Sequence, residues 1–284
     1  MTYTHTISVA QLNALRSEKP QTVLFDCRHD LAQPAWGAAQ YAASHIRGAL
    51  FANLDTDLSG AKTASGGRHP LPDRDAFVAW LASKGVAADS TVVVYDQLDG
   101  MYAARLWWMC RWAGIQSVAV LAGGYTAWVA QGGKTGAISP SPQPVRAWNL
   151  PALETVLSID QVEANLQTQT FTLIDARAPE RYRGEVEPLD PVAGHIPGAV
   201  NRFFKRNVTP QGDFAPDLAA QWAALLGDTP AKAWAHSCGS GVSACHNILA
   251  LHVAGKLAPD QASQLFAGSW SAWCSDTSRP AAKG

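Results

Sequence analysis

The chain has 284 residues, which suggests two domains of ordinary size, since a domain usually holds roughly 100 to 200 residues. Hydrophobic residues make up 47% of it, and 22 Lys and Arg nearly balance 23 Asp and Glu. This balance excludes a disordered polyelectrolyte and offers no electrostatic basis for binding nucleic acid. Charged residues are only 16% while tryptophans number 11, so we expect much of the chain to be buried.

Short β-branched runs alternate with segments of helical periodicity along the whole chain, which predicts an α/β fold with parallel sheets flanked by helices. In the first half we expect helices at 8–16 and 73–84, begun by Ser8 and Asp73 as N-caps, and strands at 22–26, 91–95 and 117–121. In the second half we expect strands at 171–175, 232–236 and 264–267, and helices at 160–166, 217–226 and from near 241 to 254.

Three motifs of the first half recur in the second half, in the same order and at a nearly constant spacing. Residues 22–28 resemble 171–177, residues 45–49 resemble 195–199, and residues 122–128 resemble 267–273. The chain is therefore predicted to be two copies of one domain, at 1–137 and 156–284. The residues between them, 138–155, include closely spaced prolines and should form an extended linker.

The terminal sequence and the cysteines indicate the compartment. The first residues show neither a secretion signal nor an organelle-targeting pattern, and glycine, glutamine and threonine interrupt the longest uncharged stretch, 112–133. We therefore expect a cytoplasmic protein that enters no membrane. The five cysteines are an odd number without a Cys-x-x-Cys pair, which argues against disulfides and a structural zinc site. An important cysteine should act alone.

The two copies differ at a position where chemistry is expected. Ligands of open parallel sheets bind beyond the carboxyl ends of the strands, and pairing Gly100 with Gly241 in the loops found there puts Gln97 opposite Cys238. The glycines around Cys238 let backbone N–H groups turn inward at a helix N-terminus, which favours a thiolate and could also hold a persulfide. We therefore expect Cys238 to be a nucleophile; the alternative is a small buried core residue.

Several motifs together identify a family. They are His195-Ile-Pro-Gly-Ala199 with its copy at 45–49, Tyr95-Asp96, Tyr102-Ala-Ala-Arg105, Gly67-Arg-His-Pro-Leu-Pro72, Asp175-Ala-Arg177, Arg181-Tyr-Arg-Gly184 and Cys238-Gly-Ser-Gly-Val-Ser-Ala244. With them, the sequence resembles the tandem rhodanese-like sulfurtransferases over essentially its whole length. The resemblance implies two rhodanese-like domains, the first catalytically inactive and the second catalytic, with the site between them.

The reaction that this resemblance implies has two half-steps. Cys238 takes a sulfur from a small anionic donor and becomes a persulfide, and cyanide, a small thiol or thioredoxin then accepts that sulfur. No metal or organic cofactor is implied. Arg181 matches the position that binds the anionic group of the donor. The loop residues that follow the cysteine are expected to bind substrate as well: Gly239, Gly241, Val242, Ser243 and Ala244.

The donor is indicated by the residues after the cysteine. Gly239 and Ser240 are uncharged, which resembles the loop of mercaptopyruvate enzymes, whereas thiosulfate enzymes place cations there. In the mercaptopyruvate branch the loop serine belongs to a triad that handles protons, and His69 and Asp55 match its other members. We therefore favour 3-mercaptopyruvate as the donor, with thiosulfate:cyanide sulfurtransfer as the alternative.

Some features weaken or compete with this assignment. A second arginine that mercaptopyruvate enzymes carry would fall near Leu189 and is absent; Arg183 or Arg177 could compensate, although an ion pair with Asp175 is favoured for Arg177. A related cysteine-loop phosphatase would need an arginine where Ala244 and Cys245 stand. The remaining rival is a sulfur-carrier or regulatory module without enzymatic activity.

Overall fold

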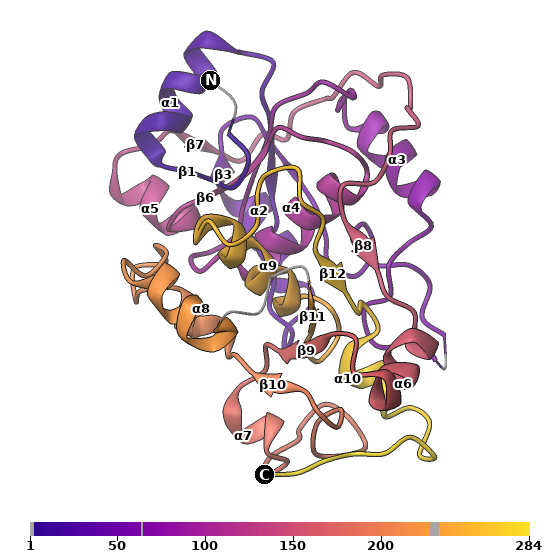
Figure 1. The fold of residues 1–284 in the computed structure, drawn as a ribbon. Coiled ribbons are helices and arrows are strands. Elements are labelled where there is room, and N and C mark those ends of the chain that lie inside the picture. Colours follow the sequence, from indigo (N-terminus) through magenta and orange to yellow (C-terminus); the bar gives the residue numbers. More distant parts are fainter. Residues whose placement is uncertain (1–2, 64, 228–232) are drawn as a thin grey trace. The chain divides into compact units, whose positions relative to one another are not determined.

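The structure, a computed structural model, describes residues 3–63, 65–227 and 233–284 (Figure 1). It divides into two compact units. The N-terminal unit comprises Met1–Gly60, Pro72–Leu153 and Val208–Phe214, and the C-terminal unit comprises Ala61–Leu71, Glu154–Asn207 and Ala215–Gly284. A short segment of each half thus belongs to the unit built mainly from the other half. In consequence His69 lies in the C-terminal unit and Asp55 in the N-terminal unit.

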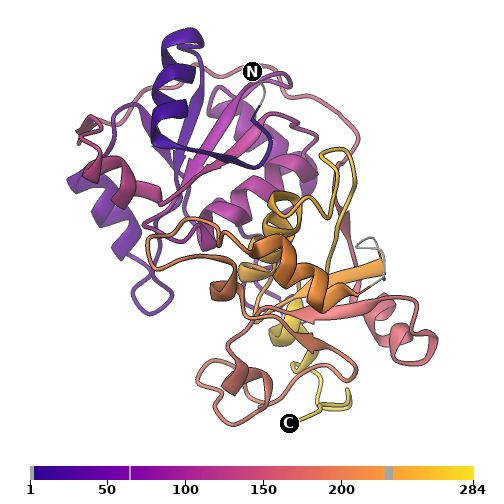
Figure 2. The same ribbon diagram turned by 60° about the vertical axis from the view of Figure 1, so that its left-hand side comes forward.

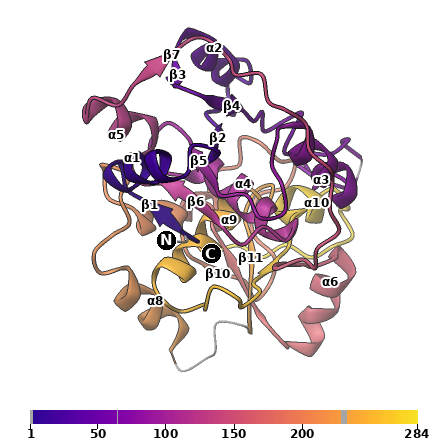
Figure 3. The ribbon, with the colours of Figure 1, turned by 90° about the horizontal axis from the view of Figure 1, so that it is seen from above.

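The N-terminal unit is built on five parallel strands in the order β1-β6-β5-β2-β4, which Figure 3 shows side by side. Their bounds are β1 Thr6–Ile7, β2 Val23–Asp26, β4 Ala49–Phe51, β5 Val92–Tyr95 and β6 Val118–Leu121. A separate antiparallel pair joins β3, His45–Ile46, to β7, Thr135–Gly136. Valine and leucine dominate β5 and β6, and every residue of these strands is buried, as expected where helices cover both faces.

Five helices belong to this sheet: α1 Val9–Glu18, α2 Trp36–Ala43, α3 Arg74–Ser83, α4 Met101–Trp112 and α5 Gly124–Ala130. Leu12 of α1 and Trp128 of α5 pack on one face with Leu24 of β2, and Figure 2 shows α1 in indigo over the strands. On the other face Phe25 stacks on Trp80 of α3, with ring centroids 5.5 Å apart. The predicted N-caps are confirmed: Ser8 forms a capping box with Gln11, and Asp73 accepts the N–H of Ala76.

The C-terminal unit repeats this plan. Its parallel strands run in the order β10-β9-β11-β12-β8, with bounds β8 Thr155–Val156, β9 Thr172–Asp175, β10 Val200–Asn201, β11 Trp234–Ser237 and β12 Gln264–Leu265. Its helices are α6 Ile159–Thr168, α7 Pro179–Tyr182, α8 Leu218–Leu226, α9 Ser243–Val253 and α10 Ser269–Trp273, with a 3-10 turn at Phe204–Asn207. Val162 of α6 and Trp273 of α10 pack on one face of this sheet, and Trp222 of α8 meets His236 of β11 on the other.

The predicted strands and helices are confirmed with ends that shift by at most two residues, and Lys232, the first residue of one predicted strand, lies outside the described residues. The two-residue edge strands β1, β8 and β10 escaped prediction because they are too short to show alternation. Residues 138–145 contain neither helix nor strand, and the N–H of Val145 donates to the carbonyl of Ala82 at 2.9 Å. Among the described residues no helix is long and apolar enough to cross a membrane.

Buried ion pairs hold the same place in both repeats. The Arg28 guanidinium donates to Asp26 and to the carbonyl of Ser44, and the Arg177 guanidinium donates to Asp175 and to the carbonyl of Gly194. All four charged side chains are almost completely buried. The structural ion pair predicted for Arg177 is therefore confirmed. Because the equivalent pair is present in the first repeat, which has no counterpart of Cys238, this ion pair stabilises the domain fold.

Candidate active site

Cys238 is the first residue after β11, and α9 begins five residues later at Ser243. The side chain is 2% exposed, and its Sγ accepts the N–H of Gly241 at 3.1 Å. Gly241 has φ +77°, and a Cβ at this residue would lie only 2.4 Å from the carbonyl oxygen of Ala267. Glycine is therefore required both by the backbone conformation and by the close approach of the backbone at Ala267. The loop curls as expected and directs an N–H group at the sulfur.

Ser269, at the start of α10, also meets the cysteine and was not predicted as a site residue. Its Oγ accepts the N–H of Cys238 at 3.0 Å, donates to the carbonyl of Phe266 at 2.9 Å, and lies 4.0 Å from the Cys238 Sγ. Ser269 has φ +53°, a conformation that is strained for a residue with a Cβ. The corresponding residue in the motif repeat is Gly124, with φ +54°, so a serine at a glycine position was the signal available in the sequence.

Ser240 and His69 come together within the C-terminal unit. The His69 Nδ1 and the Ser240 Oγ are 2.7 Å apart, and both side chains are nearly buried. Gly67, with φ +79°, lets this segment approach α10 closely, because a Cβ there would lie 2.7 Å from the Ser271 Oγ. Two members of the expected triad are therefore in hydrogen-bond contact.

The third member, Asp55, lies in the N-terminal unit. Its carboxylate is 3.8 Å from the Nε2 of His29. Burial lowers the pKa of His29, and the charges of Asp55 and Asp30 oppose that shift. The role of Asp55 beside His69 stays a prediction.

Arg181 lies beside the residue that follows the cysteine. A Cβ at Gly239 would be 3.4 Å from the Arg181 Nη1, and 2.7 Å from the Nη2 of Arg68, which sequence reasoning did not select. The Arg181 guanidinium donates to Glu187 at 2.7 Å and to Asp190 at 3.3 Å. Two guanidinium groups therefore converge at Gly239, next to the nucleophile.

Arg177 contributes a third positive charge near the cysteine. Burial lowers its pKa, whereas the negative charges of Asp175, Glu187 and a Cys238 thiolate raise it, and the net direction is upward. The guanidinium therefore stays charged, and it is within electrostatic reach of the sulfur. Its partners Asp175 and Glu187 lie 2.7 and 3.4 Å away.

The remaining loop residues begin the helix. Val242 is the N-cap of α9, and Ser243 and Ala244 are its first residues. Their N–H groups belong to the set that a helix leaves without intrahelical acceptors, which gives this end its affinity for anions. Cys245 is fully buried and its Sγ donates to the carbonyl of Gly241 at 3.3 Å, in agreement with a packing role.

The pairing of Gln97 with Cys238 was wrong. Tyr95 and Ser237 occupy the same register beside the equivalent residues Asp26 and Asp175, so the next residues, Asp96 and Cys238, correspond. The backbone agrees, because the Asp96 carbonyl accepts the N–H of Tyr125 just as the Cys238 carbonyl accepts the N–H of Trp270. The positive-φ glycine stands one residue later in the first loop, and for that reason alignment on glycines misplaced the cysteine.

Asp96 therefore fills the position of the nucleophile in the first repeat. Its carboxylate accepts the N–H groups of Leu98, Gly100, Tyr102 and Ala103 at 2.9–3.2 Å. Burial and the neighbouring charge of Asp99 raise the pKa of Asp96 to about 6, against the opposing effect of these hydrogen bonds. The anion-binding loop that both repeats share is thus occupied by a side chain of the protein itself.

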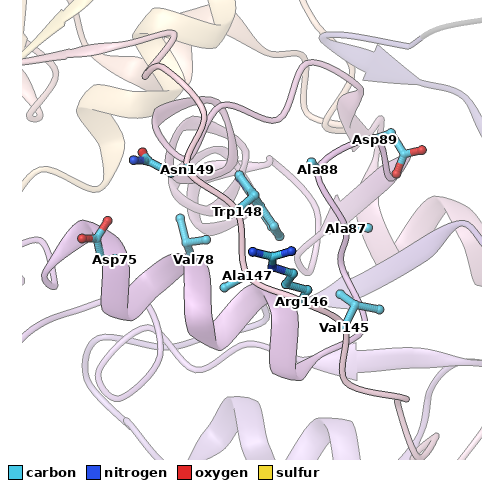
Figure 4. A pocket seen from close by; sticks show the side chains of 10 residues that line it. All are labelled: Asp75, Val78, Ala87, Ala88, Asp89, Val145, Arg146, Ala147, Trp148 and Asn149. Atoms are coloured by element: carbon cyan, nitrogen blue, oxygen red, sulfur yellow. The ribbon is translucent and has the colours of Figure 1, made fainter.

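A hollow of about 790 Å³ in the N-terminal unit lies between α3 and the linker (Figure 4). Asp75 and Val78 of α3 and the linker residues Arg146 and Trp148 line it. Among the described residues that line it there is no cysteine, serine or histidine, so this hollow offers no thiol, hydroxyl or imidazole for covalent catalysis.

Comparison with known proteins assigns the same repeats. The model of the rhodanese-like domain matches residues 8–131 and 158–276. A probable 3-mercaptopyruvate sulfurtransferase of Pseudomonas aeruginosa is 42% identical over 279 residues, 97% of each chain. A putative thiosulfate sulfurtransferase of Mycobacterium tuberculosis is 38% identical, covering 98% of this chain and 96% of its own. The crystal structure of a 3-mercaptopyruvate sulfurtransferase of Escherichia coli superposes with a TM-score of 0.78 at 29% identity, covering 94% of this chain and 99% of that one.

Proposed function

This chain belongs to the family of tandem rhodanese-like sulfurtransferases, and we propose that it takes sulfur from 3-mercaptopyruvate through a persulfide on Cys238. The observation that carries the proposal is the arrangement around one sulfur atom. Gly241 donates an N–H to the Cys238 Sγ, and the neighbouring Ser240 is hydrogen-bonded to His69. The first contact stabilises a thiolate and the second is able to move a proton.

In the first half-step the Cys238 thiolate attacks the sulfur of the donor. A sulfur–sulfur bond forms and the carbon–sulfur bond of mercaptopyruvate breaks, so the carbon keeps the bonding electrons as an enolate. The proton of the donor thiol must reach that carbon to give pyruvate, and the Ser240–His69 pair provides a route for it. The persulfide takes the place of the thiolate in the loop, where the N–H of Gly241 stabilises its charge.

In the second half-step an acceptor attacks the outer sulfur of the persulfide. The sulfur–sulfur bond breaks, the outer sulfur leaves with the acceptor, and Cys238 returns to the thiolate. We propose cyanide, a small thiol or thioredoxin as the acceptor. Each can be tested on the isolated persulfide form, since the two half-steps are separate.

The test is the intact mass of the protein after incubation with each donor. We expect mercaptopyruvate to add one sulfur atom that dithiothreitol removes. Cys238→Ser should abolish the adduct, while Cys245→Ser is the matched control, because its hydroxyl can still donate to the carbonyl of Gly241. Absence of the adduct with every donor would refute a sulfurtransferase reaction at this cysteine and favour a binding module. Equal loss in the two variants would point to a redox pair.

Thiosulfate is the second candidate donor. The convergence of Arg68 and Arg181 at Gly239 favours it, because two guanidinium groups suit a dianion. A relative that is 38% identical is named a putative thiosulfate sulfurtransferase. The ratio of kcat/KM for mercaptopyruvate and thiosulfate with one acceptor decides between them, and a preference for thiosulfate would overturn our choice.

We also propose that the first repeat has no sulfurtransferase activity. Its loop has the shape of an anion cradle, but the carboxylate of Asp96 occupies the place of the thiol and receives four N–H groups. A carboxylate cannot form a persulfide. Wild-type protein should therefore gain one removable sulfur and not two, and Cys238→Ser, which keeps Asp96, should gain none, as intact mass measures directly.

A further inference from the structure

The segment that carries Arg68 is fixed against the cysteine loop within the C-terminal unit. The backbone N–H of Arg68 donates to the Ser271 Oγ at 3.0 Å, and the next residue, His69, contacts Ser240. These contacts direct the Arg68 guanidinium at Gly239, where its Nη2 is 2.7 Å from the position of a Cβ. The backbone of Arg68 is therefore held beside the cysteine loop, and Gly239 leaves room for the guanidinium.

The present partners of these arginines are two acidic residues of the segment 185–192. Asp190 pairs with both Arg68 and Arg181, and Glu187 pairs with Arg181. The side chains of the two acids are 3% exposed, whereas those of Arg68 and Arg181 are 27% and 18% exposed. The acids are therefore buried, and the guanidinium groups retain an accessible surface on which a ligand can bind.

We propose that Arg68 is a binding residue for the anionic end of the donor, acting together with Arg181. It provides the second donor-binding arginine, which is absent at the expected position near Leu189. We further propose that the Asp190 carboxylate holds the place of the donor carboxylate in the resting enzyme and leaves these guanidinium groups when the donor binds. This inference rests on the proposed function and identifies the residues that bind the anionic group of the donor.

The charges of the cluster explain why an exchange is required. Three guanidinium groups, those of Arg68, Arg177 and Arg181, face three carboxylates, those of Asp175, Glu187 and Asp190. The thiolate and the donor carboxylate add two negative charges to this balanced set. Asp175 and Glu187 are held by the buried Arg177, so Asp190 is the carboxylate whose release costs least. Replacement of one carboxylate by another keeps the guanidinium groups paired.

The first test compares two donors in Arg68→Met, which keeps the aliphatic stem of the side chain. Mercaptopyruvate carries the carboxylate, and mercaptoacetone has the same thiol and ketone without it. We expect kcat/KM for mercaptopyruvate to fall about 10- to 100-fold, chiefly through KM, because a charged hydrogen-bond partner is lost. The kcat/KM for mercaptoacetone should stay unchanged. Arg279→Met is the matched control, because the guanidinium of Arg279 pairs instead with Glu163 and Asp276.

The second test asks whether Asp190 acts through Arg68. Asp190→Asn should lower KM for mercaptopyruvate several-fold, and this gain should disappear in the Arg68→Met/Asp190→Asn double variant. Equal losses for both donors in Arg68→Met would show a merely structural role and overturn the inference, as would full activity of that variant. A KM that Asp190→Asn raises would refute the exchange.

The donor assignment can fail separately. If the wild-type protein forms its persulfide from thiosulfate and not from mercaptopyruvate, the proposed donor is wrong, and the same variants are then measured with thiosulfate. A drop in kcat/KM for thiosulfate in Arg68→Met supports the role of Arg68 in binding an anionic donor. An unchanged value overturns it.

Discussion

Replacement of Gly241 by alanine tests the geometry of the cysteine loop. The substitution places a Cβ on a residue with φ +77°, which costs about 1 to 2 kcal/mol. It also sets that Cβ 2.4 Å from the Ala267 carbonyl oxygen, where ordinary contact begins at 3.4 Å, so the loop must move or distort. Forced packing of this kind costs about 1 to 3 kcal/mol, which brings the expected loss of unfolding free energy to about 2 to 5 kcal/mol.

Gly255, just after α9, provides the matched control. It has φ +66° and no atom within 4 Å of an added Cβ, so Gly255→Ala should lose only the cost of the backbone conformation, about 1 to 2 kcal/mol. Urea unfolding measures both variants. The displaced N–H of Gly241 should also slow persulfide formation about tenfold or more in Gly241→Ala, whereas Gly255→Ala should load sulfur at the wild-type rate. Equal stability losses in the two variants, or a normal loading rate in Gly241→Ala, would refute the close approach.

Two other consequences are open to measurement. His69→Ala and Ser240→Ala should each slow single-turnover persulfide formation about 100-fold, and the double variant should be no slower, because the two side chains act as a pair 2.7 Å apart; losses that add would contradict this. Burial lowers the pKa of His236 to about 3, below its unfolded value, so its contribution to stability is complete above pH 6.5 and is lost as the pH falls towards 3. Between pH 7 and pH 5 the unfolding free energy should fall by about 2 kcal/mol more in wild type than in His236→Phe; identical pH profiles would show that His236 is not held neutral.

The parts of the fold that the sequence predicts are those decided locally. Ser8 and Gln11 form a capping box because the residues that make it are three positions apart, and strands such as β5 show as uninterrupted β-branched runs. Assignment of residues 61–71 to the C-terminal unit is decided by contacts between distant segments, such as that of Arg68 with Ser271. Sequence motifs place His69 near the site through the family resemblance, but nothing local separates Arg68 from a solvent-facing arginine. Its importance follows only from the room that Gly239 leaves.

Comparison of the repeats separates residues that stabilise the fold from residues that serve the reaction. One histidine makes the same contacts in each repeat: His45 is hydrogen-bonded to the Tyr41 carbonyl and stacks on the Tyr41 ring, and His195 makes both contacts with Tyr182. A residue whose contacts recur in a repeat without the thiol cannot owe its place to sulfur chemistry.

The most informative positions are those where the backbone is strained in one repeat and unstrained in the other. Gly124 adopts its positive φ without strain, whereas Ser269 adopts nearly the same φ at the expense of its Cβ and thereby sets a hydroxyl 4.0 Å from the Cys238 sulfur. Strain of this kind persists where the surroundings enforce it and where the side chain contributes something that glycine lacks. At Ser269 that contribution is a hydrogen bond from the N–H of Cys238 itself, so the backbone of the nucleophile is fixed by a side chain that the first repeat does not have. The sulfur-transfer site therefore differs from the first repeat on two elements, the loop after β11 and the start of α10, and not only by having a cysteine where the first repeat has Asp96.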